Sequence, residues 1–451
     1  MASIKSSRLT ILGSHASAWL TLVLVIVHQG FIASSAYFLT NAIKDLQAGR
    51  PFEISLILYF VSMILPFAPG CLSYVTMQFW ANAAHARLVA LFKNRFLGQT
   101  AVYRSQSAKE KIDSIISRNS FSTIFGYVGY IHGFVSFSLN SILSLLVIAC
   151  LLPSGIWEGY LISVIACAAV IAAITPGISK LSNQSQEELA GYGQLLGKIW
   201  VNTTLGNALN FKNWDLQTKK RGGQYYKSLI KLAWAKQFGN FFLGLVTLIP
   251  TAYLVYSTVT APAVDATLVA AIIVNLTRVF HILNSLGSLV YQFIEFGAVD
   301  ASFKFLLNAS KLEYYDTPKP EINSIRVNGL PVDNYAVAAS RILTASNGRF
   351  TVRGANGSGK TAFLLTLKTS DPQNSFYLPA SVESLMWSET RENLSTGERI
   401  LSALMEIQKM GEIKVLLLDE WDANLDQQNT DKTNAFLDEL AAQKVIVEIR
   451  H

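Results

Sequence analysis

Six long apolar segments, nearly free of charged residues, occupy most of the first 300 residues of this 451-residue chain. A run of about 20 apolar residues is long enough to cross a bilayer as a helix. The whole chain is 51% apolar and 15% charged, whereas soluble proteins are about 25% charged. We therefore predict a polytopic α-helical membrane domain with six long spans, at residues 17–41, 55–83, 122–150, 158–178, 239–260 and 265–297.

The distribution of basic residues predicts the orientation of these spans. Segments 84–120 and 178–239 are rich in Lys and Arg, whereas 151–158 and 257–266 contain neither. Basic loops stay on the cytosolic side of a membrane, so we expect both long loops and both termini in the cytosol. The same loops account for the net charge of +7 and favour contact with anionic membrane lipid. The charge therefore gives no reason to expect a nucleic-acid partner.

The three cysteines carry no metal or disulfide pattern. Cys71, Cys150 and Cys167 each lie in an apolar segment without CxxC spacing, which favours small buried side chains. The first apolar run, 16–38, is too long for the core of a signal peptide, and no A-x-A site follows it. We therefore expect no cleaved leader.

A phosphate-binding loop lies in the last quarter of the chain. Gly354–Thr361 matches the pattern G-x-x-x-x-G-K-[ST] at every fixed position, between an apolar strand candidate and a helix candidate. This strand–loop–helix context is the one in which the pattern binds nucleotide phosphates. Lys360 is expected to reach the β and γ phosphates of ATP, and Thr361 to bind Mg²⁺. The loop residues expected to hold the phosphates are Gly354, Asn356, Gly357, Ser358 and Gly359.

Two carboxylates end a later apolar run. Val415–Leu418 is apolar without alternation, as expected of a buried parallel strand. Asp419 at its end is expected to hold Mg²⁺, and Glu420 to polarise the water that attacks ATP. The two acids therefore complete a candidate ATPase site.

Three more motifs accompany this site. Leu394–Glu398 reads L-S-T-G-E, Ala423–Asp426 reads A-N-L-D, and the apolar stretch 444–450 leads into His451. In this order, and with apolar spans upstream, the motifs resemble those of ATP-binding cassette (ABC) transporters of the exporter type. The resemblance covers nearly the whole chain, and Thr396, where Gly is commoner, is similar to exporters of cyclic peptides.

The resemblance implies a role for each motif. Ser395 and Gly397 would contact the γ phosphate of ATP held by a partner's phosphate loop, so two ATPase domains must dimerise. Asp426 would align the two halves, and His451 would contact the γ phosphate as a catalytic residue. Tyr335 either stacks on adenine or is an ordinary surface tyrosine.

The resemblance also implies the domain organisation. We predict a transmembrane domain at 1–305, a linker at 306–330 and a shortened α/β P-loop (RecA-like) nucleotide-binding domain at 331–451. Lys111–Ser120 and Leu205–Asp215 resemble the loops that touch the ATPase domain in such exporters, although each also fits a solvated helix with one apolar stripe.

Two departures from the family pattern bear on coupling. Ala380, in Tyr377–Ala380, replaces the glutamine that senses the metal and the membrane domain in the family. The segment 385–394 runs straight into L-S-T-G-E, where a helical subdomain normally intervenes, and the chain stops at His451. We therefore expect ATP binding to be intact and its coupling to transport to be altered.

The sequence thus predicts an ATP-driven exporter of a peptide or other amphipathic compound in the bacterial inner membrane, working as a homodimer with ATP and Mg²⁺. A half-transporter with a different partner chain, and a membrane ATPase or sensor that gates a partner, stay open as alternatives. Polar residues inside the predicted spans are candidates for cargo contact: His28, Gln29, Asn275, Arg278 and His281.

Overall fold

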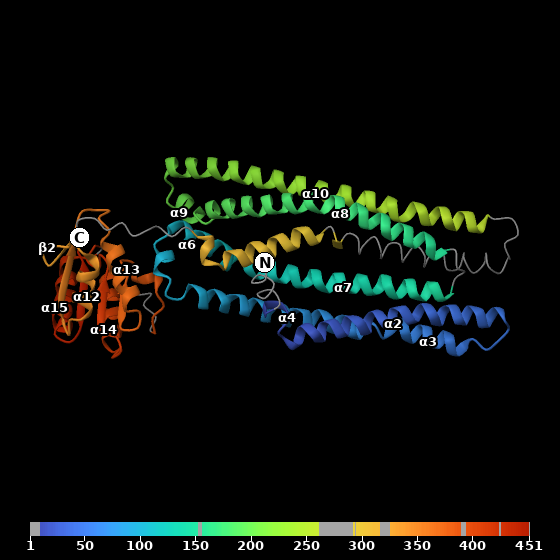
Figure 1. Ribbon diagram of the computed structural model, residues 1–451, viewed down its shortest axis with the longest axis horizontal. Helices are drawn as coiled ribbons and strands as arrows, with labels where there is room; N and C mark the ends of the chain where they lie inside the picture. The colour runs from blue at the N-terminus through green and yellow to red at the C-terminus, as the bar shows by residue number, and fades with distance from the viewer. Residues whose placement is uncertain are drawn as a thin grey trace. The chain divides into compact units, whose positions relative to one another are not determined.

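The computed structural model describes residues 10–151, 156–260, 292–293, 295–315, 325–388, 394–423 and 425–450. The chain divides into two compact units (Figure 1). The helical unit comprises Met1–Asn94 and Glu110–Tyr314, and the sheet unit comprises Arg95–Lys109 and Tyr315–His451. The short segment 95–109 therefore belongs to the sheet unit, although the rest of that unit begins only at residue 315.

Long helices make up the helical unit (Figure 1). Antiparallel α8 and α10 pack along their lengths around buried Ile178, Leu232 and Leu243. The described elements are α2 (Ala16–Gln47), α3 (Glu53–Ile64), α4 (Phe67–Phe96), α6 (Gln106–Asp113), the π-helical turn η1 (Ser114–Asn119), α7 (Ser120–Leu151), α8 (Ile156–Leu196), α9 (Ile199–Thr204), α10 (Ala208–Val259) and the 3₁₀ turn η2 (Leu312–Tyr314). Residues 295–309 are also helical.

Two of the described helical stretches are long and apolar enough to cross a membrane. They are Ala16–Gln47 and Glu53–Phe96, with mean hydropathies of 1.8 and 1.9 in their most apolar windows. The predicted spans at 122–150 and 158–178 fall within α7 and α8, and 239–260 falls within α10 except for its last residue. Most of the sixth, 265–297, lies outside the described residues. The count of six spans therefore stays a prediction.

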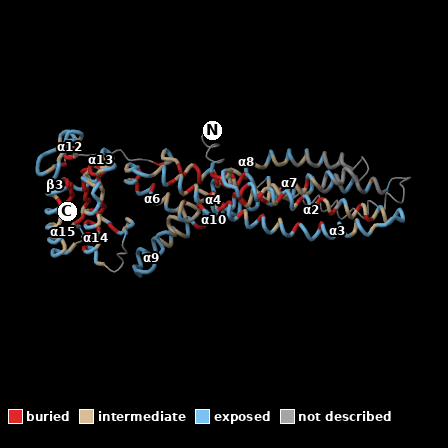
Figure 2. The backbone as a smooth tube through the Cα atoms, turned by 90° about the horizontal axis from the view of Figure 1, so that it is seen from below, coloured by how far each residue is buried: buried red, intermediate tan, exposed pale blue. Residues whose placement is uncertain are grey.

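Much of the apolar surface of α3 and α4 is exposed within the chain (Figure 2). Ile54, Ile57, Ile64 and Phe67 are all more than half exposed. An apolar surface of this extent normally contacts a membrane or another protein. These helices therefore have the surface that a membrane-embedded helix needs.

The sheet unit contains a six-stranded mixed sheet in the order β2-β1-β3-β6-β5-β4. β3, β6, β5 and β4 are parallel to one another, and β1 and β2 join the edge of β3 antiparallel. The strands are β1 (Arg326–Val327), β2 (Leu330–Pro331), β3 (Gly348–Arg353), β4 (Ser375–Leu378), β5 (Val415–Leu418) and β6 (Val445–Ile449). All residues of β5 and β6 are buried, which explains their apolar runs.

Helices cover both faces of this sheet. α12 (Tyr335–Leu343) and α13 (Lys360–Ser370) pack on one face, where Ile342 and Phe363 join a core with Val352 and Leu417. α14 (Thr396–Gln408) and α15 (Gln427–Ala441) pack on the other. This three-layer α/β arrangement agrees with the predicted P-loop domain, and the parallel strands end at one edge where ligands of such sheets bind.

The connection between β4 and α14 is short, as the sequence predicts. Among its described residues, 379–388 and 394–395, the one-turn η3 (Val382–Ser384) is the only helix. Trp387 packs into the core formed by α14 and α15 and donates from Nε1 to the Val382 carbonyl, 3.2 Å away. This part of the connection is therefore held directly on the α/β core.

Candidate nucleotide site and its surroundings

The phosphate loop connects β3 to α13 with a backbone that demands glycine. Gly357 and Gly359 have φ angles of 79° and 88°, a region that residues with a side chain rarely adopt. At Gly354, a Cβ atom would lie 2.4 Å from the Ser358 Oγ. The three glycines therefore allow the chain to curl tightly before α13 begins at Lys360, with its free N–H groups at the loop.

Two side chains of the loop have polar groups suited to an anion. The Lys360 Nζ donates to the carbonyls of Gly354 and Ala355, at 3.0 and 3.3 Å, so the ammonium folds over its own loop. The Ser358 Oγ is buried and has no hydrogen-bond partner within the described part of the chain. A buried hydroxyl without a partner costs free energy, which a bound phosphate oxygen would recover.

The loop and the acidic strand end meet at Thr361 and Asp419. The Thr361 Oγ1 donates to the Asp419 Oδ1 at 3.1 Å. On its other side, the Tyr377 hydroxyl donates to Oδ2 at 2.6 Å. The Asp419 backbone N–H also donates to the Leu378 carbonyl at 3.0 Å, which continues the ladder between β4 and β5. Asp419 is thus fixed at three points and is 7% exposed.

The surroundings of Asp419 raise the pKa of its carboxyl and that of the Tyr377 hydroxyl. Burial raises the pKa of its carboxyl, and nearby Glu420 adds to the effect. Hydrogen bonds from Tyr377 and Thr361, with the charge of Lys360, act in the opposite direction without cancelling it. Burial and the negative charge of Asp419 also raise the pKa of Tyr377. The tyrosine is therefore a neutral hydrogen-bond donor here.

Glu420 sits in a strained backbone position directly after Asp419. Its φ angle of 46° lies in the left-handed region, which costs a residue with a side chain on the order of 1 kcal/mol or more. The next residue, Trp421, is buried and donates from Nε1 to the Glu448 Oε2 at 3.0 Å. The buried indole therefore anchors the turn that presents Glu420.

The L-S-T-G-E motif forms the start of α14. Ser395 caps the helix, and the Glu398 carboxylate accepts from the Ser395 backbone N–H at 2.9 Å, which completes a capping box. At Gly397, a Cβ atom would lie 2.6 Å from the Cγ of Asn429. Asn429 in turn bonds both oxygens of Asp426, the cap of α15. Ser395, Gly397 and Asp426 therefore lie close together.

Of the other predicted residues, Tyr335 lies at the start of α12. It is half-buried, packs against the core and has its ring 6.4 Å from that of Phe363. Both readings of Tyr335, as a residue that stacks on adenine and as an ordinary surface tyrosine, stay predictions. His451 lies outside the described residues, as do the cargo candidates Asn275, Arg278 and His281.

A short helix, α5 (Thr100–Tyr103), belongs to the sheet unit. Its Thr100 Oγ1 lies 2.7 Å from the Thr369 Oγ1 of α13, and the Tyr103 ring meets the Tyr377 ring edge-on at 5.9 Å. The predicted contact segment, Lys111–Ser120, forms the end of α6, η1 and the start of α7.

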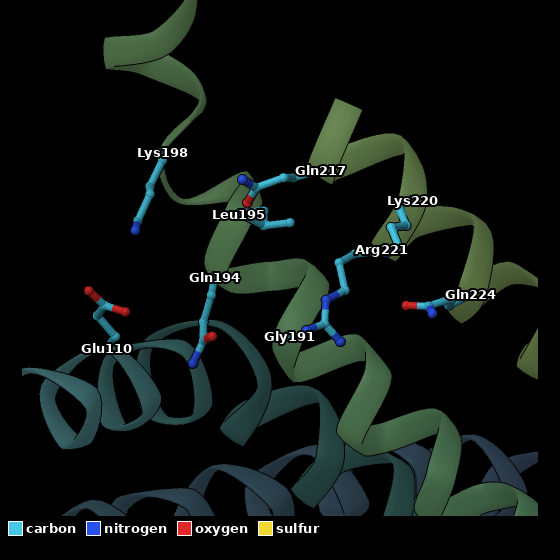
Figure 3. A pocket seen from close by; sticks show the side chains of 9 residues that line it. All are labelled: Glu110, Gly191, Gln194, Leu195, Lys198, Gln217, Lys220, Arg221 and Gln224. Atoms are coloured by element: carbon cyan, nitrogen blue, oxygen red, sulfur yellow. The ribbon is translucent and has the colours of Figure 1, made fainter. Parts of the chain in front are cut away.

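A separate polar cavity of 480 Å³ lies within the helical unit (Figure 3). α10 contributes residues spaced i, i+3, i+4 and i+7, α8 contributes residues spaced i, i+3 and i+4, and Lys198 follows the end of α8. Lys198, Lys220 and Arg221 in the wall are all exposed. Figure 3 shows the Arg221 guanidinium directed toward Gly191, which has no side chain to block it. The full lining is Glu110, Gly191, Gln194, Leu195, Lys198, Gln217, Lys220, Arg221 and Gln224. This cavity lies in the basic segments 84–120 and 178–239, and its lining includes no residue of the nucleotide site.

Comparison with known proteins identifies the fold. No protein-family model matches the chain, and no curated protein matches it. Among solved structures, it is similar to one titled "Structure of a bacterial Atm1-family ABC exporter with ATP bound", with a TM-score of 0.59 and 12% identity over 100% of this chain and 91% of that chain. The chain therefore has the fold of an ABC exporter.

Proposed function

We propose that this protein is a membrane ATPase that drives export of a compound across a bilayer. The observation that carries the proposal is the hydrogen bond between Thr361 and Asp419, 3.1 Å long. Thr361 directly follows a loop whose conformation requires glycine at Gly357 and Gly359. It occurs in a chain with the fold of an ABC exporter. The fold supports export, and the contact supports ATP hydrolysis.

The residues present fit Mg²⁺ and ATP. Mg²⁺ prefers oxygen ligands, and Thr361 and Asp419 offer a hydroxyl and a carboxylate on adjoining elements. When bound, the metal would neutralise charge on the phosphates of ATP. Lys360 would move from its loop carbonyls to a phosphate oxygen, and the Ser358 hydroxyl would gain its missing partner.

Glu420 is the proposed general base. It directly follows the metal-binding acid, and the buried Trp421 and the left-handed turn hold it in place. Its carboxylate would orient the attacking water and take a proton from it. His451 would help to hold the γ phosphate, and Tyr335 would contact the adenine.

We propose a homodimer as the working unit. In each copy, Ser395, Gly397 and Asp426 gather at the starts of α14 and α15, where free backbone N–H groups favour an anion. In the dimer, this surface would close over ATP bound by the partner's phosphate loop. Two ATP molecules would then be shared between two copies of the chain.

The proposed location is the bacterial inner membrane, with six spans and both termini in the cytosol. The exposed apolar surfaces of α3 and α4 and the basic loops support this assignment. The proposed cargo is a peptide or another amphipathic compound, in keeping with Thr396 in the L-S-T-G-E motif.

Reconstitution into lipid vesicles tests the proposal. The parent protein is expected to hydrolyse ATP and to concentrate cargo on the far side of the membrane. Lys360→Ala is expected to lose ATP binding, whereas Glu420→Gln is expected to bind ATP and to hydrolyse it about 10² to 10⁴ times more slowly. Hydrolysis by Glu420→Gln at the parent rate would contradict the role of Glu420.

A second candidate function rests on Ala380 and the short connection after β4. Both fit a half-transporter with a different partner, or an ATP sensor that gates another protein. Hydrolysis by the chain purified alone favours the homodimer over the half-transporter. Stimulation of hydrolysis by cargo in vesicles favours the exporter over the sensor.

A further inference from the structure

A break in a predicted membrane helix lies beside a small polar cavity. α3 ends at Ile64 and α4 begins at Phe67, with Pro66 and Pro69 in the sequence Pro66-Phe-Ala-Pro-Gly70. Proline removes a backbone donor, and a broken helix within a membrane is tolerated where it borders protein or a cavity. Such proline- and glycine-interrupted segments often mark binding sites in membrane transport proteins.

The cavity has a volume of 200 Å³ and lies between α2, α4 and α7 of the helical unit. Its wall includes His28, Ser73, Tyr74, His132 and Ser136. Ser73 and His132 are buried, whereas Tyr74 is 62% exposed and marks the open side. Ionisable side chains within membrane helices are costly and usually serve a function, so two histidines around one cavity need an explanation.

Hydrogen bonds define which ring nitrogen of each histidine carries the proton. His28 Nδ1 lies 2.7 Å from the Pro66 carbonyl, which only accepts, so Nδ1 is the donor. The Ser73 hydroxyl donates to the Gly70 carbonyl at 2.7 Å and can therefore only accept from His132 Nε2, 2.9 Å away. In the neutral rings, His28 Nε2 and His132 Nδ1 are then acceptors.

The Gln29 amide is bonded to Ser136, a residue of the cavity wall. The Gln29 side chain is 5% exposed and donates from Nε2 to the Ser136 Oγ at 2.7 Å. Its Oε1 is buried and has no hydrogen-bond partner among the residues that the structure describes. A buried amide oxygen without a partner costs about 1–3 kcal/mol, and the bond to Ser136 holds this amide beside the cavity wall.

The ring of His28 is held in place by close packing. A Cβ atom at Gly70 would lie 2.9 Å from the His28 Nδ1. Glycine at the helix break therefore gives the imidazole room to reach the Pro66 carbonyl. The Tyr74 ring lies 4.6 Å from that of His132 and adds an aromatic surface.

We propose that this pocket binds the primary ammonium group of an amphipathic compound. The free nitrogens of the two histidines are acceptors, which suit N–H donors better than a carboxylate or phosphate, and the aromatic wall attracts a cation. At 200 Å³, the cavity is smaller than the roughly 300 Å³ or more of typical drug sites. It therefore fits a head group, whose apolar part would leave past Tyr74. The proposal rests on the proposed export function for its membrane setting and names the chemistry of its cargo.

Thermal unfolding of the purified full chain tests binding directly, without nucleotide. The probes are hexylammonium, hexyltrimethylammonium and hexanoate, which share one alkyl chain, at about pH 8, where histidine is neutral. Hexylammonium is expected to raise the melting temperature by roughly 2 to 4 °C. Equal stabilisation by hexyltrimethylammonium, which has no N–H donor, or by hexanoate would overturn the proposal.

Substitutions locate the effect. His132→Phe and Gln29→Leu are expected to abolish the shift in melting temperature. His85→Phe is the control: His85 lies elsewhere on α4, where its imidazole bonds Ser120, and its replacement is expected to leave the shift unchanged. Gln29→Glu keeps the shape, adds a negative charge and is expected to bind hexylammonium at least tenfold more tightly. Unchanged binding in both Gln29 variants would place the probe elsewhere and refute the site.

Two further measurements complete the test. One distinguishes a membrane lipid from a free cargo as the source of the ammonium group, and the other distinguishes failure of this proposal from failure of the export proposal. Stabilisation by phosphatidylethanolamine vesicles over phosphatidylcholine vesicles would assign the ammonium to a membrane lipid, and stabilisation by hexylammonium alone to a free cargo. Glu420→Gln is expected to bind hexylammonium like the parent. Binding without any ATP hydrolysis would refute the export proposal and leave the ammonium site standing, and hydrolysis without selective binding would do the reverse.

Discussion

At the scale of single residues, Tyr377 gives Asp419 a second support. Its hydroxyl donates to one carboxylate oxygen at 2.6 Å, while Thr361 donates to the other at 3.1 Å. The Tyr377 ring also contacts Tyr103 of α5. Tyr377 is three residues before Ala380, where the family has its glutamine. A tyrosine thus connects Asp419, the acid proposed to bind the metal, with α5 in a chain that has Ala380 at the position of this glutamine.

Tyr377→Phe is expected to slow ATP turnover while leaving ATP affinity nearly unchanged. The substitution keeps the ring and its contact with Tyr103 but removes a hydrogen bond to a carboxylate, worth about 1.5–3 kcal/mol. If most of that is lost in the transition state, kcat falls roughly tenfold or more. Steady-state ATPase kinetics measure it, with Tyr103→Phe as the control, and a change confined to KM would contradict the positioning role.

Ala380→Gln is expected to change how strongly cargo stimulates hydrolysis more than it changes ATP affinity. Glutamine at this position would add a polar side chain near the metal site, whereas the phosphate loop is untouched. The parent protein is expected to show low hydrolysis with little stimulation by cargo. ATPase rates in lipid with and without cargo measure both forms, and strong stimulation in the parent that the substitution leaves unaltered would mean that another residue carries coupling.

The features of the candidate site that the sequence predicts well are those that depend on neighbours in the chain. Gly357 and Gly359 of the phosphate loop have positive φ angles, and Asp419 follows a buried strand. Tyr377 was missed as a site residue because its partner Asp419 is 42 positions away. Only the pairing of β4 with β5 brings their side chains together.

At the scale of elements, the Glu448 carboxylate in β6 connects β3 with the turn that contains Glu420 and Trp421. It is 1% exposed in β6, a strand that reads as apolar in sequence. Arg349 of β3 binds both of its oxygens, at 2.9 and 2.8 Å. Arg450 and Trp421 also donate to it. One buried carboxylate thus fixes the residue after Glu420 and the residue before His451.

Stability of the sheet unit is expected to fall as the pH drops below about 4.5, the ordinary pKa of glutamate. Burial alone would raise the pKa of Glu448, but the bonds and charge of Arg349, with Arg450, lower it overall. A group with a lowered folded pKa stabilises the protein above its unfolded pKa, and this contribution disappears as pH falls through the folded pKa. Trp fluorescence during thermal unfolding at stepped pH measures the effect.

Glu448→Gln provides the matched test of this network. Removal of one partner from a buried ion pair costs about 3–5 kcal/mol, so the variant is expected to melt at a lower temperature near pH 7 and to lose this part of the acid sensitivity. Glu439→Gln, an exposed glutamate on α15, is the control and is expected to behave like the parent. Equal melting temperatures for Glu448→Gln and the parent would show that the network adds no stability.

At the scale of the whole molecule, periodicity and motif order predict that the chain has a helical part and an α/β part. They do not predict which residues belong to each unit. Composition predicts long helices, and motif spacing predicts a P-loop sheet. Nothing in the polar sequence 95–109 indicates that it belongs with a sheet more than 200 residues later. Its membership depends on side-chain contacts such as Thr100 with Thr369, which no local pattern encodes.

Crosslinking tests the proposed dimer at this scale. In a chain whose native Cys71, Cys150 and Cys167 are replaced by serine, cysteines at Ser395 and Ser358 are expected to form an intermolecular disulfide only with ATP. Ser395 caps α14 and Ser358 lies in the phosphate loop, and dimer closure would bring one from each copy within the roughly 4.4–6.8 Å between Cα atoms that a disulfide needs.

Two controls decide what the crosslink means. Lys360→Ala in the same background removes the ammonium from the phosphate loop, so it is expected to abolish both ATP binding and the disulfide. Mixing chains that carry only one of the two cysteines should give disulfide-linked dimers of the two different chains, resolved on a non-reducing gel. Because closure needs ATP between two surfaces, dimer formation should rise with ATP concentration along the binding curve. A disulfide that forms equally without ATP, or only within one chain, would contradict the shared site and with it the homodimer.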